Sequence, residues 1–552
     1  MARVFLALSF VATATVALAQ QTAAIATAHP LATAAGYEIL KRGGNAFDAA
    51  VAAAAALGVV EPYSSGLGGG GFWLLHRAED AREVMVDARE TAPAAVKPEQ
   101  YIDANGKPIP GATRRGGLAV AIPGAPAGID HVARRYGKLP LSATLAPAIR
   151  YAREGFPVDP RYAELAKLRE RYLHEGRGTS IFLDRGHAPQ RGYVLRQPQL
   201  AATLERLARE GASAFYSGDI AAQLVSAVNA AGGVWQRADL EQYRVIERAP
   251  IRFTYRGARI TTAALPSAGG IALAQTLGML ERFAPGSPRD AQYAHLVVEA
   301  LRRAFQDRAR YLGDSDFAPV PLARLLDRGY IAARAVSIDT EHATPSDALA
   351  REAPRTGESR NTTHLSVVDE AGNRVAATLT INLLFGAGIV AGDTGVLLNN
   401  EMDDFTVAEA VPNAFLLHGA AANAIAPGKR PLSSMTPTFV EDARGVLVLG
   451  SPGGSRIVSQ VLLAILEYLH APEVDLDRIA AMPRYHHQYW PDRVEIEPDG
   501  FPPAWREALT AKGHTLHVGR RKWGNMQLVF KARESGIAQA ASDPRGAGIA
   551  WY

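Results

Sequence analysis

One threonine in this sequence stands where it can become a nucleophile. Thr362 lies in Asn361-Thr362-Thr363-His364, at the junction of a polar linker and a strand-like segment. A threonine hydroxyl is a poor nucleophile unless a base lies beside it, and the free α-amino group of the same residue, with a pKa of about 7.7–8.0, can be that base. That amino group exists only after the preceding peptide bond is cut. The motif therefore indicates a nucleophile made by cleavage between Asn361 and Thr362.

A predicted β-hairpin begins directly after Thr362 and brings polar side chains to it. Residues 363–368 and 374–381 alternate and are rich in β-branched side chains, and turn residues lie between them. With the turn centred midway, Thr362 lies opposite the stretch from Thr380 to Asn382. Because side chains two apart share one face of a strand, Thr380 and Asn382 point the same way, beside Thr362.

The segment before Thr362 is predicted to be an exposed linker. From about residue 340 to 361, Pro, Ser, Thr, Arg and Glu dominate and large apolar side chains nearly vanish. A threonine at the start of a strand is common, so the motif alone would favour an ordinary strand residue. The linker, the strand and the facing polar groups together favour a catalytic threonine.

A second motif, Gly450-Ser451-Pro452-Gly453-Gly454, offers backbone amides. It is not a serine nucleophile elbow, because Leu449 stands where the elbow needs glycine and Pro452 lacks the N–H that such elbows use. The Gly453-Gly454 pair follows a predicted strand and precedes a predicted helix. Paired amides at a helix N-terminus make a good oxyanion site, although a simple strand–helix turn is the alternative.

Two further patterns carry no chemistry. The glycine run from Gly66 to Gly71 formally fits GxGxxG, but it leads into a strand rather than a helix, so close backbone packing or a tight turn is expected. His486-His487 has no HExxH context, and surface or packed histidines are expected instead of a zinc site. The sequence predicts no cofactor and no metal.

Composition narrows the class of protein and its compartment. The 552 residues are 48% hydrophobic with a formal charge of +4, which gives nucleic-acid binding no support. The absence of cysteine excludes disulfides and cysteine nucleophiles. Residues 1–19 have one Arg, an apolar run and Ala17-Leu18-Ala19, which is typical of a secretory signal peptide. The run is shorter than the roughly 20 residues that span a membrane, so we expect a secreted, periplasmic protein without a membrane anchor after signal removal.

Taken together, these residues resemble the γ-glutamyltransferase (γ-glutamyltranspeptidase) family of N-terminal-nucleophile hydrolases. The resemblance runs from His29 to the end of the chain. It is densest at the motifs Gly43–Ala50, Ser65–Gly71, Arg89–Pro93, Tyr311–Asp314, Thr362–Asp369, Asn399–Phe405, Lys429–Met435, Gly450–Arg456 and Ala541–Arg545.

The resemblance implies an α/β fold, a four-layer α-β-β-α sandwich built jointly by two autocleaved subunits. The large subunit would span residues 20–361 and the small subunit 362–552, and the two would stay associated. Thr362 would attack the γ-glutamyl amide of glutathione or a related compound. The acyl group would then pass to water, an amino acid or a dipeptide.

The resemblance also assigns roles within the site. Thr380 would hydrogen-bond the nucleophile, and Gly453 and Gly454 would supply the oxyanion amides. The zwitterionic end of the glutamyl group would be held by residues of opposite charge at its two ends. They are Arg89, Ser433 and Ser434 at the α-carboxylate, and Asn382, Glu401 and Asp404 at the α-amino group.

Two departures and two rivals remain. Phe415, in the predicted lid 409–420, replaces the tyrosine of many members, and Trp523–Gln527 differs from the commoner Met-Gly-Ser-x-Gln. One rival is a cephalosporin or glutaryl acylase on the same scaffold, which would not need the amino-binding residues. The other is a non-catalytic binding protein that is never processed.

Overall fold

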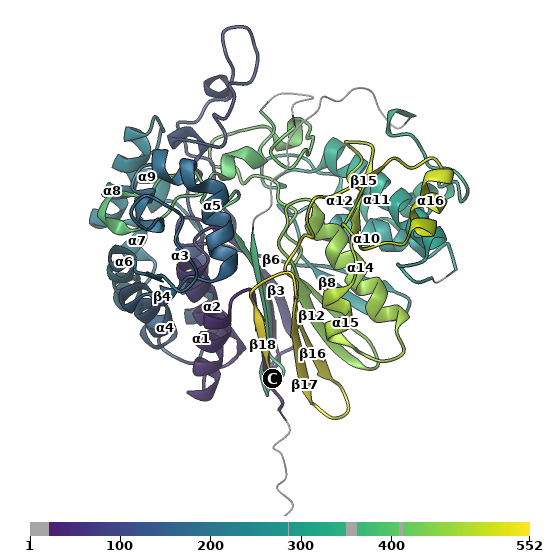
Figure 1. The fold of residues 1–552 in the computed structure, drawn as a ribbon, viewed down its shortest axis with the longest axis horizontal. Coiled ribbons are helices and arrows are strands. Elements are labelled where there is room, and N and C mark those ends of the chain that lie inside the picture. Colours follow the sequence, from purple (N-terminus) through teal and green to yellow (C-terminus); the bar gives the residue numbers. More distant parts are fainter. Residues whose placement is uncertain (1–20, 285, 349–361, 408–411) are drawn as a thin grey trace, which may run out of the picture.

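Two antiparallel β-sheets lie face to face and carry helices on their outer faces (Figure 1). The computed structural model describes residues 21–284, 286–348, 362–407 and 412–552. Small apolar side chains such as Ala26, Ala376 and Val448 pack between the sheets. The predicted α-β-β-α sandwich is therefore confirmed.

The first sheet has seven strands in the order β18-β1-β9-β10-β2-β3-β6. Their bounds are Ile549–Trp551 (β18), Ala24–Thr27 (β1), Thr363–Val368 (β9), Arg374–Thr380 (β10), Gly70–Arg77 (β2), Arg82–Ala88 (β3) and Ile246–Arg248 (β6). The predicted hairpin is the central pair, β9 and β10. It lies between β1 and β2, which come from the other side of the predicted cleavage point.

The second sheet has six strands in the order β17-β16-β12-β11-β8-β7. Their bounds are Ala538–Ser542 (β17), Gln527–Ala532 (β16), Gly445–Gly450 (β12), Thr438–Glu441 (β11), Ala258–Thr262 (β8) and Ile251–Tyr255 (β7). Two minor sheets pair β4 (Phe156–Pro157) with β5 (Val194–Leu195), and β13 (Tyr485–His486) with β14 (Val494–Ile496) and β15 (Leu516–Val518).

Helices α1–α9 lie on the side of the first sheet. They are Pro30–Lys41, Ala46–Val60, Ala125–Tyr136, Leu141–Glu154, Pro160–Glu175, Pro198–Glu210, Ser213–Tyr216, Gly218–Ala230 and Arg237–Glu241. Helix α2 (Ala46–Val60) is apolar almost all round and nearly fully buried, as expected for a core helix. Asn45 and Asp48 form a capping box that fixes its start.

Helices α10–α16 lie on the side of the second sheet. They are Gly269–Leu280, Ala291–Tyr311, Leu322–Leu325, Arg328–Val336, Arg456–His470, Leu476–Ala481 and Pro503–Ala511. Along the described part of the chain, none of the helices is long and apolar enough to cross a membrane. The predicted signal peptide, residues 1–19, lies outside the described residues.

The glycine run lets backbones approach one another closely at the start of β2. A Cβ atom on Gly69 would lie 2.0 Å from the carbonyl oxygen of Thr380, and one on Gly68 would lie 2.0 Å from that of Leu397. Glycine is required because any side chain there would meet main-chain atoms. The expected close packing is confirmed, and one of its contacts is the strand that carries Thr380.

The linker before Thr362 is described as far as residue 348. Its residues 340–347 are mostly exposed or half-buried, but Ser346 is buried. Its hydroxyl accepts from Arg302 at 2.6 Å, and its amide donates to Asp492 at 2.7 Å. The linker therefore leaves the body of the protein from a fixed point, and Asn361 lies outside the described residues.

Candidate active site

Thr362 lies immediately before β9, opposite the last residue of β10. The register pairs Leu379 with Thr363, which sets Thr362 against Thr380 as the hairpin predicted. The Thr362 hydroxyl donates to Thr380 Oγ1 at 3.4 Å, and Thr380 Oγ1 also accepts from the amide of Asn382 at 2.8 Å. Thr362 has a φ of 139°, a value that β-branched residues rarely adopt and that marks local strain.

His364, two residues along, does not serve as the base. Its ring is fully buried, and Nδ1 lies 2.8 Å from Thr378 Oγ1 while Nε2 lies 3.2 Å from Ser366 Oγ. Burial lowers its pKa to about 3, so the imidazole is neutral at any ordinary pH. This histidine therefore does not compete with the α-amino group that cleavage would free on Thr362 for the role of base.

Thr362 forms part of the wall of a cavity of about 310 Å³. Nine of the predicted site residues line it, although they come from five separate stretches of sequence. They are Arg89, Thr362, Thr380, Asn382, Glu401, Asp404, Ser433, Ser434 and Gly454. The remaining glycine, Gly453, borders a second cavity on which Thr362 also lies.

Arg89 organises the charge of this cavity. It follows β3 and is fully buried. Its Nη2 donates a hydrogen bond to Asp404 at 2.6 Å, and its Nη1 donates one to Glu401. Its Nε donates to the carbonyl oxygen of Pro431 at 3.1 Å. Burial alone would lower the pKa of Arg89, but the carboxylates of Glu401 and Asp404 raise it. In this chain the arginine and the two acids predicted for opposite ends of the substrate pair directly with one another.

A third carboxyl group, that of Glu90, lies beside Arg89. Its Oε2 is 3.6 Å from Arg89 Nη1, and neither oxygen has a hydrogen-bond partner among the described residues. Burial raises the pKa of Glu90 to about 7 and also raises the pKa values of Glu401 and Asp404. Three carboxyl groups thus share one contacting arginine, which leaves the cluster able to accept a further cation.

Three polar atoms at the cavity are unsatisfied within the described chain. Ser434 Oγ, Glu401 Oε2 and Arg308 Nε are buried without a hydrogen-bond partner, whereas Ser433 Oγ accepts from the amide of Met435 at 3.1 Å. Buried polar atoms normally have partners. A polar ligand in the cavity would supply them.

Gly453 and Gly454 lie in the turn between β12 and helix α14 (Arg456–His470). Both have positive φ, 133° and 59°, a conformation that glycine adopts without strain. Their carbonyls accept from the amides of Arg456 and Ile457, but their own amides donate to no described residue. Free amides at a helix N-terminus beside a nucleophile are suited to bind an oxyanion.

One cavity residue was not predicted. Arg308, on α11 (Ala291–Tyr311), is only 4% exposed and lines the cavity with Thr362 and Ser434. No sequence pattern indicated it, because an arginine in a charged amphipathic helix is ordinary. Only the packing of α11 against the site brings it there.

Sequence comparison decides the family. Residues 32–552 match the family model described as gamma-glutamyltranspeptidase. The chain belongs to the γ-glutamyltranspeptidase family. The predicted family, fold and enzyme class are therefore confirmed.

Relatives within and around this γ-glutamyltranspeptidase family include both hydrolases and acylases. The glutathione hydrolase proenzyme of Pseudomonas sp. (strain A14) is 39% identical over 533 residues, covering 94% of this chain and 92% of the relative. The acylase ACY 1 proenzyme of Pseudomonas sp. (strain SE83) is 38% identical over 520 residues, covering 92% and 89%. The crystal structure of cephalosporin acylase from Bacillus halodurans superposes with a TM-score of 0.84 at 29% identity, covering 97% and 96%.

Part of the predicted lid segment contributes to the wall of the first cavity. Residues 412–420 of the lid are described, and Phe415 lines the cavity. Its ring lies against Gly454, so closely that a Cβ atom there would be 2.2 Å from it. Gln488 Nε2 donates to the carbonyl of Phe415 at 2.9 Å. The phenyl ring stands where many family members carry tyrosine, beside one of the two glycines whose amides are free.

The second departure from the family pattern faces the other cavity that Thr362 borders. This cavity encloses about 590 Å³, and residues 523–525 form part of its wall. Basic side chains from separate segments, Arg161, Lys522 and Arg545, also line it. Thr362 therefore lies between a cavity lined by both arginines and acids and a more basic one, and the altered segment belongs to the basic one.

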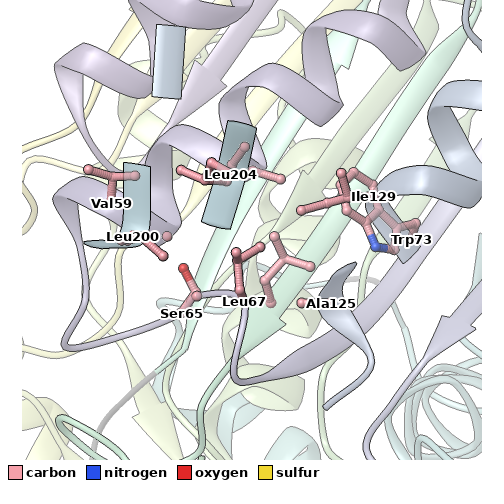
Figure 2. A pocket seen from close by; sticks show the side chains of 13 residues that line it. Val59, Ser65, Leu67, Trp73, Ala125, Ile129, Leu200 and Leu204 are labelled. Carbon is pink, nitrogen blue, oxygen red and sulfur yellow. The ribbon is translucent and has the colours of Figure 1, made fainter. Parts of the chain in front are cut away.

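A third cavity, drawn in Figure 2, is apolar and contributes nothing to the site. Val59, Leu67, Trp73 and Ile129 line it with other apolar residues, between α2 and the first sheet. Ser65 is its one hydroxyl group and is buried without a partner in the described chain. It offers neither a charged group nor a base.

The adjacent histidines His486 and His487 are packed inside the protein, which is one of the two arrangements that the sequence predicted. His486 Nδ1 lies 2.6 Å from Ser459 Oγ, and His487 Nε2 lies 3.3 Å from Asp492. Burial lowers the pKa of each to about 4. Within the described ranges no cluster of three or more His, Asp or Glu side chains is arranged to hold a metal ion.

Proposed function

We propose that this chain is an autoprocessing γ-glutamyl hydrolase and transferase. Cleavage after Asn361 frees the amino group of Thr362, which then takes the proton of the Thr362 hydroxyl. The oxygen attacks the γ-carbonyl of glutathione or a related compound, the amide C–N bond breaks, and the amine leaves with a proton. The resulting threonine ester is cut by water or by the amino group of an amino acid or dipeptide.

The position of Thr362 carries the proposal. Its hydroxyl has Thr380 as a hydrogen-bond partner at 3.4 Å, and the glycines with unused amides, Gly454 and Gly453, line the two cavities that Thr362 borders. A nucleophile, an oxyanion site and an ion-binding pocket are the parts that acyl transfer needs. We assign the two amides to the tetrahedral intermediate.

The charge of the pocket supports a zwitterionic donor. Glu401 and Asp404, with the Asn382 carboxamide, suit the α-ammonium. Together with Glu90, the third acid, they have only one contacting arginine, Arg89, to compensate their negative charge. Arg89 and the serine pair, with unpartnered Ser434 Oγ, suit the α-carboxylate. The amine that leaves, and the acceptor that replaces it, would occupy the basic cavity on the other side of Thr362.

The compartment and the two-subunit form belong to the same proposal. Residues 1–19 would be removed on export to the periplasm, and the mature enzyme would consist of residues 20–361 and 362–552. The glutathione hydrolase relatives are named proenzymes, which supports a processed form here.

The first experiment reads the N-termini of the purified protein after a denaturing gel. We expect two bands, the smaller beginning Thr362-Thr363-His364. Thr362→Ala should give one band and no turnover of γ-glutamyl-p-nitroanilide. Thr203→Ala is the matched control, because Thr203 is also buried but donates to Thr394 away from the site. A Thr362→Ala protein that still divides in two would contradict the assignment.

Acylase activity is the second candidate, favoured by the cephalosporin acylase likeness. Glutaryl-p-nitroanilide lacks the α-ammonium but keeps the terminal carboxylate. Since hydrogen bonds to charged groups contribute about 1.5–3 kcal/mol, we expect kcat/KM to favour the γ-glutamyl donor about 10- to 100-fold. Equal or better turnover of the glutaryl donor would establish the acylase instead.

A further inference from the structure

A buried glutamate of the predicted large subunit contacts the residue that follows the nucleophile. Glu61 comes directly after helix α2, is 4% exposed and lines the basic cavity together with Thr362. Its Oε2 accepts a hydrogen bond from the hydroxyl of Thr363 at 2.8 Å, and its Oε1 accepts one from the hydroxyl of Tyr63 at 3.0 Å. The proposed acyl transfer assigns no task to this carboxyl group.

The burial of Glu61 has a cost that an apolar side chain would avoid. Burial raises the pKa of Glu61, while His29 and the two hydroxyl donors partly offset that effect and Asp159 adds to it. Buried charged groups cost free energy unless hydrogen bonds compensate them. One of the two compensating bonds leads to β9, the strand that begins directly after the nucleophile.

The turn that carries Glu61 also holds the end of β10. The Glu61 carbonyl oxygen accepts from the amide of Ser64 at 2.8 Å, which closes the turn. The carbonyl oxygen of Ser64 accepts from the amide of Ile381 at 3.2 Å, one residue after Thr380. One turn therefore contacts the chain next to Thr380 and, through the Glu61 side chain, the chain next to Thr362.

Thr362 depends on this support because few contacts of its own fix it. Its φ of 139° is strained, and such strain persists only where the surroundings impose it. Among the described residues, its hydroxyl group has one hydrogen-bond partner, Thr380, at the long distance of 3.4 Å. Thr363, in contrast, is fully buried, pairs with Leu379 across the hairpin and is bonded to Glu61. The position of Thr362 therefore follows that of Thr363.

We propose that Glu61 is a positioning residue for the nucleophile. By holding the hydroxyl of Thr363, it fixes the first residue of β9 and so keeps the hydroxyl and the freed amino group of Thr362 directed at the carbonyl carbon of the donor. This inference rests on the proposed function and deepens it, because it concerns the orientation of the same threonine. The two predicted subunits thus meet in a side-chain contact one residue away from the predicted cut.

The test compares variants that break this contact with variants that keep it. Thr363→Val removes the hydroxyl and keeps the shape, and Glu61→Leu removes the carboxylate. Thr363→Ser and Glu61→Gln keep a hydrogen bond between the two positions. Thr261→Val is the matched control, because Thr261 is buried in a strand and donates to Glu83 at 3.1 Å, and neither lines a cavity that Thr362 borders.

The first measurement is the kinetics of the mature enzyme with γ-glutamyl-p-nitroanilide. Thr363→Val and Glu61→Leu should each lower kcat about tenfold or more and change KM by less than about threefold, because a displacement of about 1 Å in the site can cost about 100-fold in rate. Glu61→Gln and Thr363→Ser should recover most of that loss. The double variant should lose no more than the weaker single variant, because both side chains act through one contact.

The second measurement is the conversion of the precursor into two pieces, followed over time on a denaturing gel. Because the predicted cut lies directly before Thr362, Thr363→Val and Glu61→Leu should slow the conversion about tenfold or more, whereas Thr261→Val should match wild type. A variant that stays uncut but keeps the circular dichroism spectrum of uncut Thr362→Ala supports the inference. Loss of that spectrum in both Thr363→Val and Glu61→Leu would overturn it, because the contact would then serve folding; if only Glu61→Leu loses it, Thr363→Val decides.

The remaining outcomes separate this inference from the proposed function. Normal kcat and normal conversion in Thr363→Val would overturn the inference and leave the proposed function intact. Losses that multiply in the double variant, or an equal loss of kcat in Thr261→Val, would overturn it as well, because Glu61 and Thr363 would not then act as one unit on the site. If wild type neither divides in two nor cleaves the donor, the proposed function itself fails.

Discussion

At the residue scale, Arg89 holds two buried acids together, so its loss should reduce the stability of the protein as well as substrate binding. Arg89→Ala would leave Glu401 and Asp404 buried without their cation, which costs about 3–5 kcal/mol of stability. We expect a lower melting temperature and less mature enzyme. Arg77→Ala is the control: Arg77 pairs with Asp80 near the surface, where such pairs contribute about 0–1 kcal/mol.

The conservative variant separates charge from geometry. Arg89→Lys keeps one positive charge but cannot donate to both acids in a fixed planar arrangement. It should mature, because the acids keep a counter-ion, and should lose about 10- to 100-fold in kcat/KM for the γ-glutamyl donor. Wild-type kinetics in this variant would show that the two-armed contact is dispensable.

Glu90 gives the stability of the enzyme a pH dependence of known sign. Burial raises its pKa from 4.5 to about 7, so the folded state holds a proton that the unfolded state releases. The stabilisation is complete below about pH 4.5 and is lost as the pH rises through 7. The glutamine in Glu90→Gln stays neutral at every pH. The melting temperature of this variant minus that of wild type should therefore increase from pH 5 to pH 7.5. A pH-independent difference would contradict this, and exposed Glu79→Gln should show none.

At the scale of elements, the approach of β2 to β10 sets the position of Thr380. Gly69→Ala would place a Cβ atom 2.0 Å from the Thr380 carbonyl oxygen, so the strand end must shift. Overpacking of this kind costs about 1–3 kcal/mol. Because Thr380 contacts the nucleophile, we expect kcat to fall at least tenfold with a smaller change in KM.

The same glycine run contains its own control. A Cβ atom on Gly66 would find its nearest neighbour, the Gly58 carbonyl oxygen, at 3.6 Å, which is an ordinary contact. Gly66→Ala should therefore keep near-normal kcat. Equal losses in Gly66→Ala and Gly69→Ala would mean that the run matters for flexibility and not for the position of Thr380.

Local patterns were enough to predict the hairpin and the polar side chain that faces Thr362 across it. Alternation and turn residues fixed the register that sets Thr362 opposite Thr380, and the strand–turn–helix around Gly453 followed from the same kind of signal. Strand β1 (Ala24–Thr27) was missed, because a run of four residues, mostly small, is too short to show a strand pattern. Its place in the sheet depends on pairing with β9 and β18, which are distant in sequence.

Contacts between distant segments explain what the sequence could not supply. The direct pairing of Arg89 with Glu401 and Asp404 joins residues more than 300 positions apart. The unpaired state of Arg308 is likewise a property of the assembled cavity rather than of α11. Sequence motifs named the groups proposed to meet the substrate, but not which of their charges already pair with one another in the folded chain.

At the scale of the whole molecule, both predicted subunits contribute strands to each of the two large sheets. In the first sheet β9 and β10 lie between β1 and β2, and β18 closes the edge beside β1. In the second sheet β11 pairs with β8 across the same division. Cutting one bond before Thr362 breaks none of these ladders, so the two pieces remain one folded body.

We therefore expect the processed pieces to separate only on unfolding. Native mass spectrometry should show one species with one copy of each piece, and urea should release both pieces over the same transition that removes activity, because each completes the other's sheets. Uncut Thr362→Ala provides the reference for a covalent link and should unfold at a similar urea concentration. Separation of the two pieces under native conditions, with each piece keeping the circular dichroism spectrum of a folded protein, would contradict the shared sheets. In that case β9 and β10 would have left β1 and β2 as exposed sheet edges.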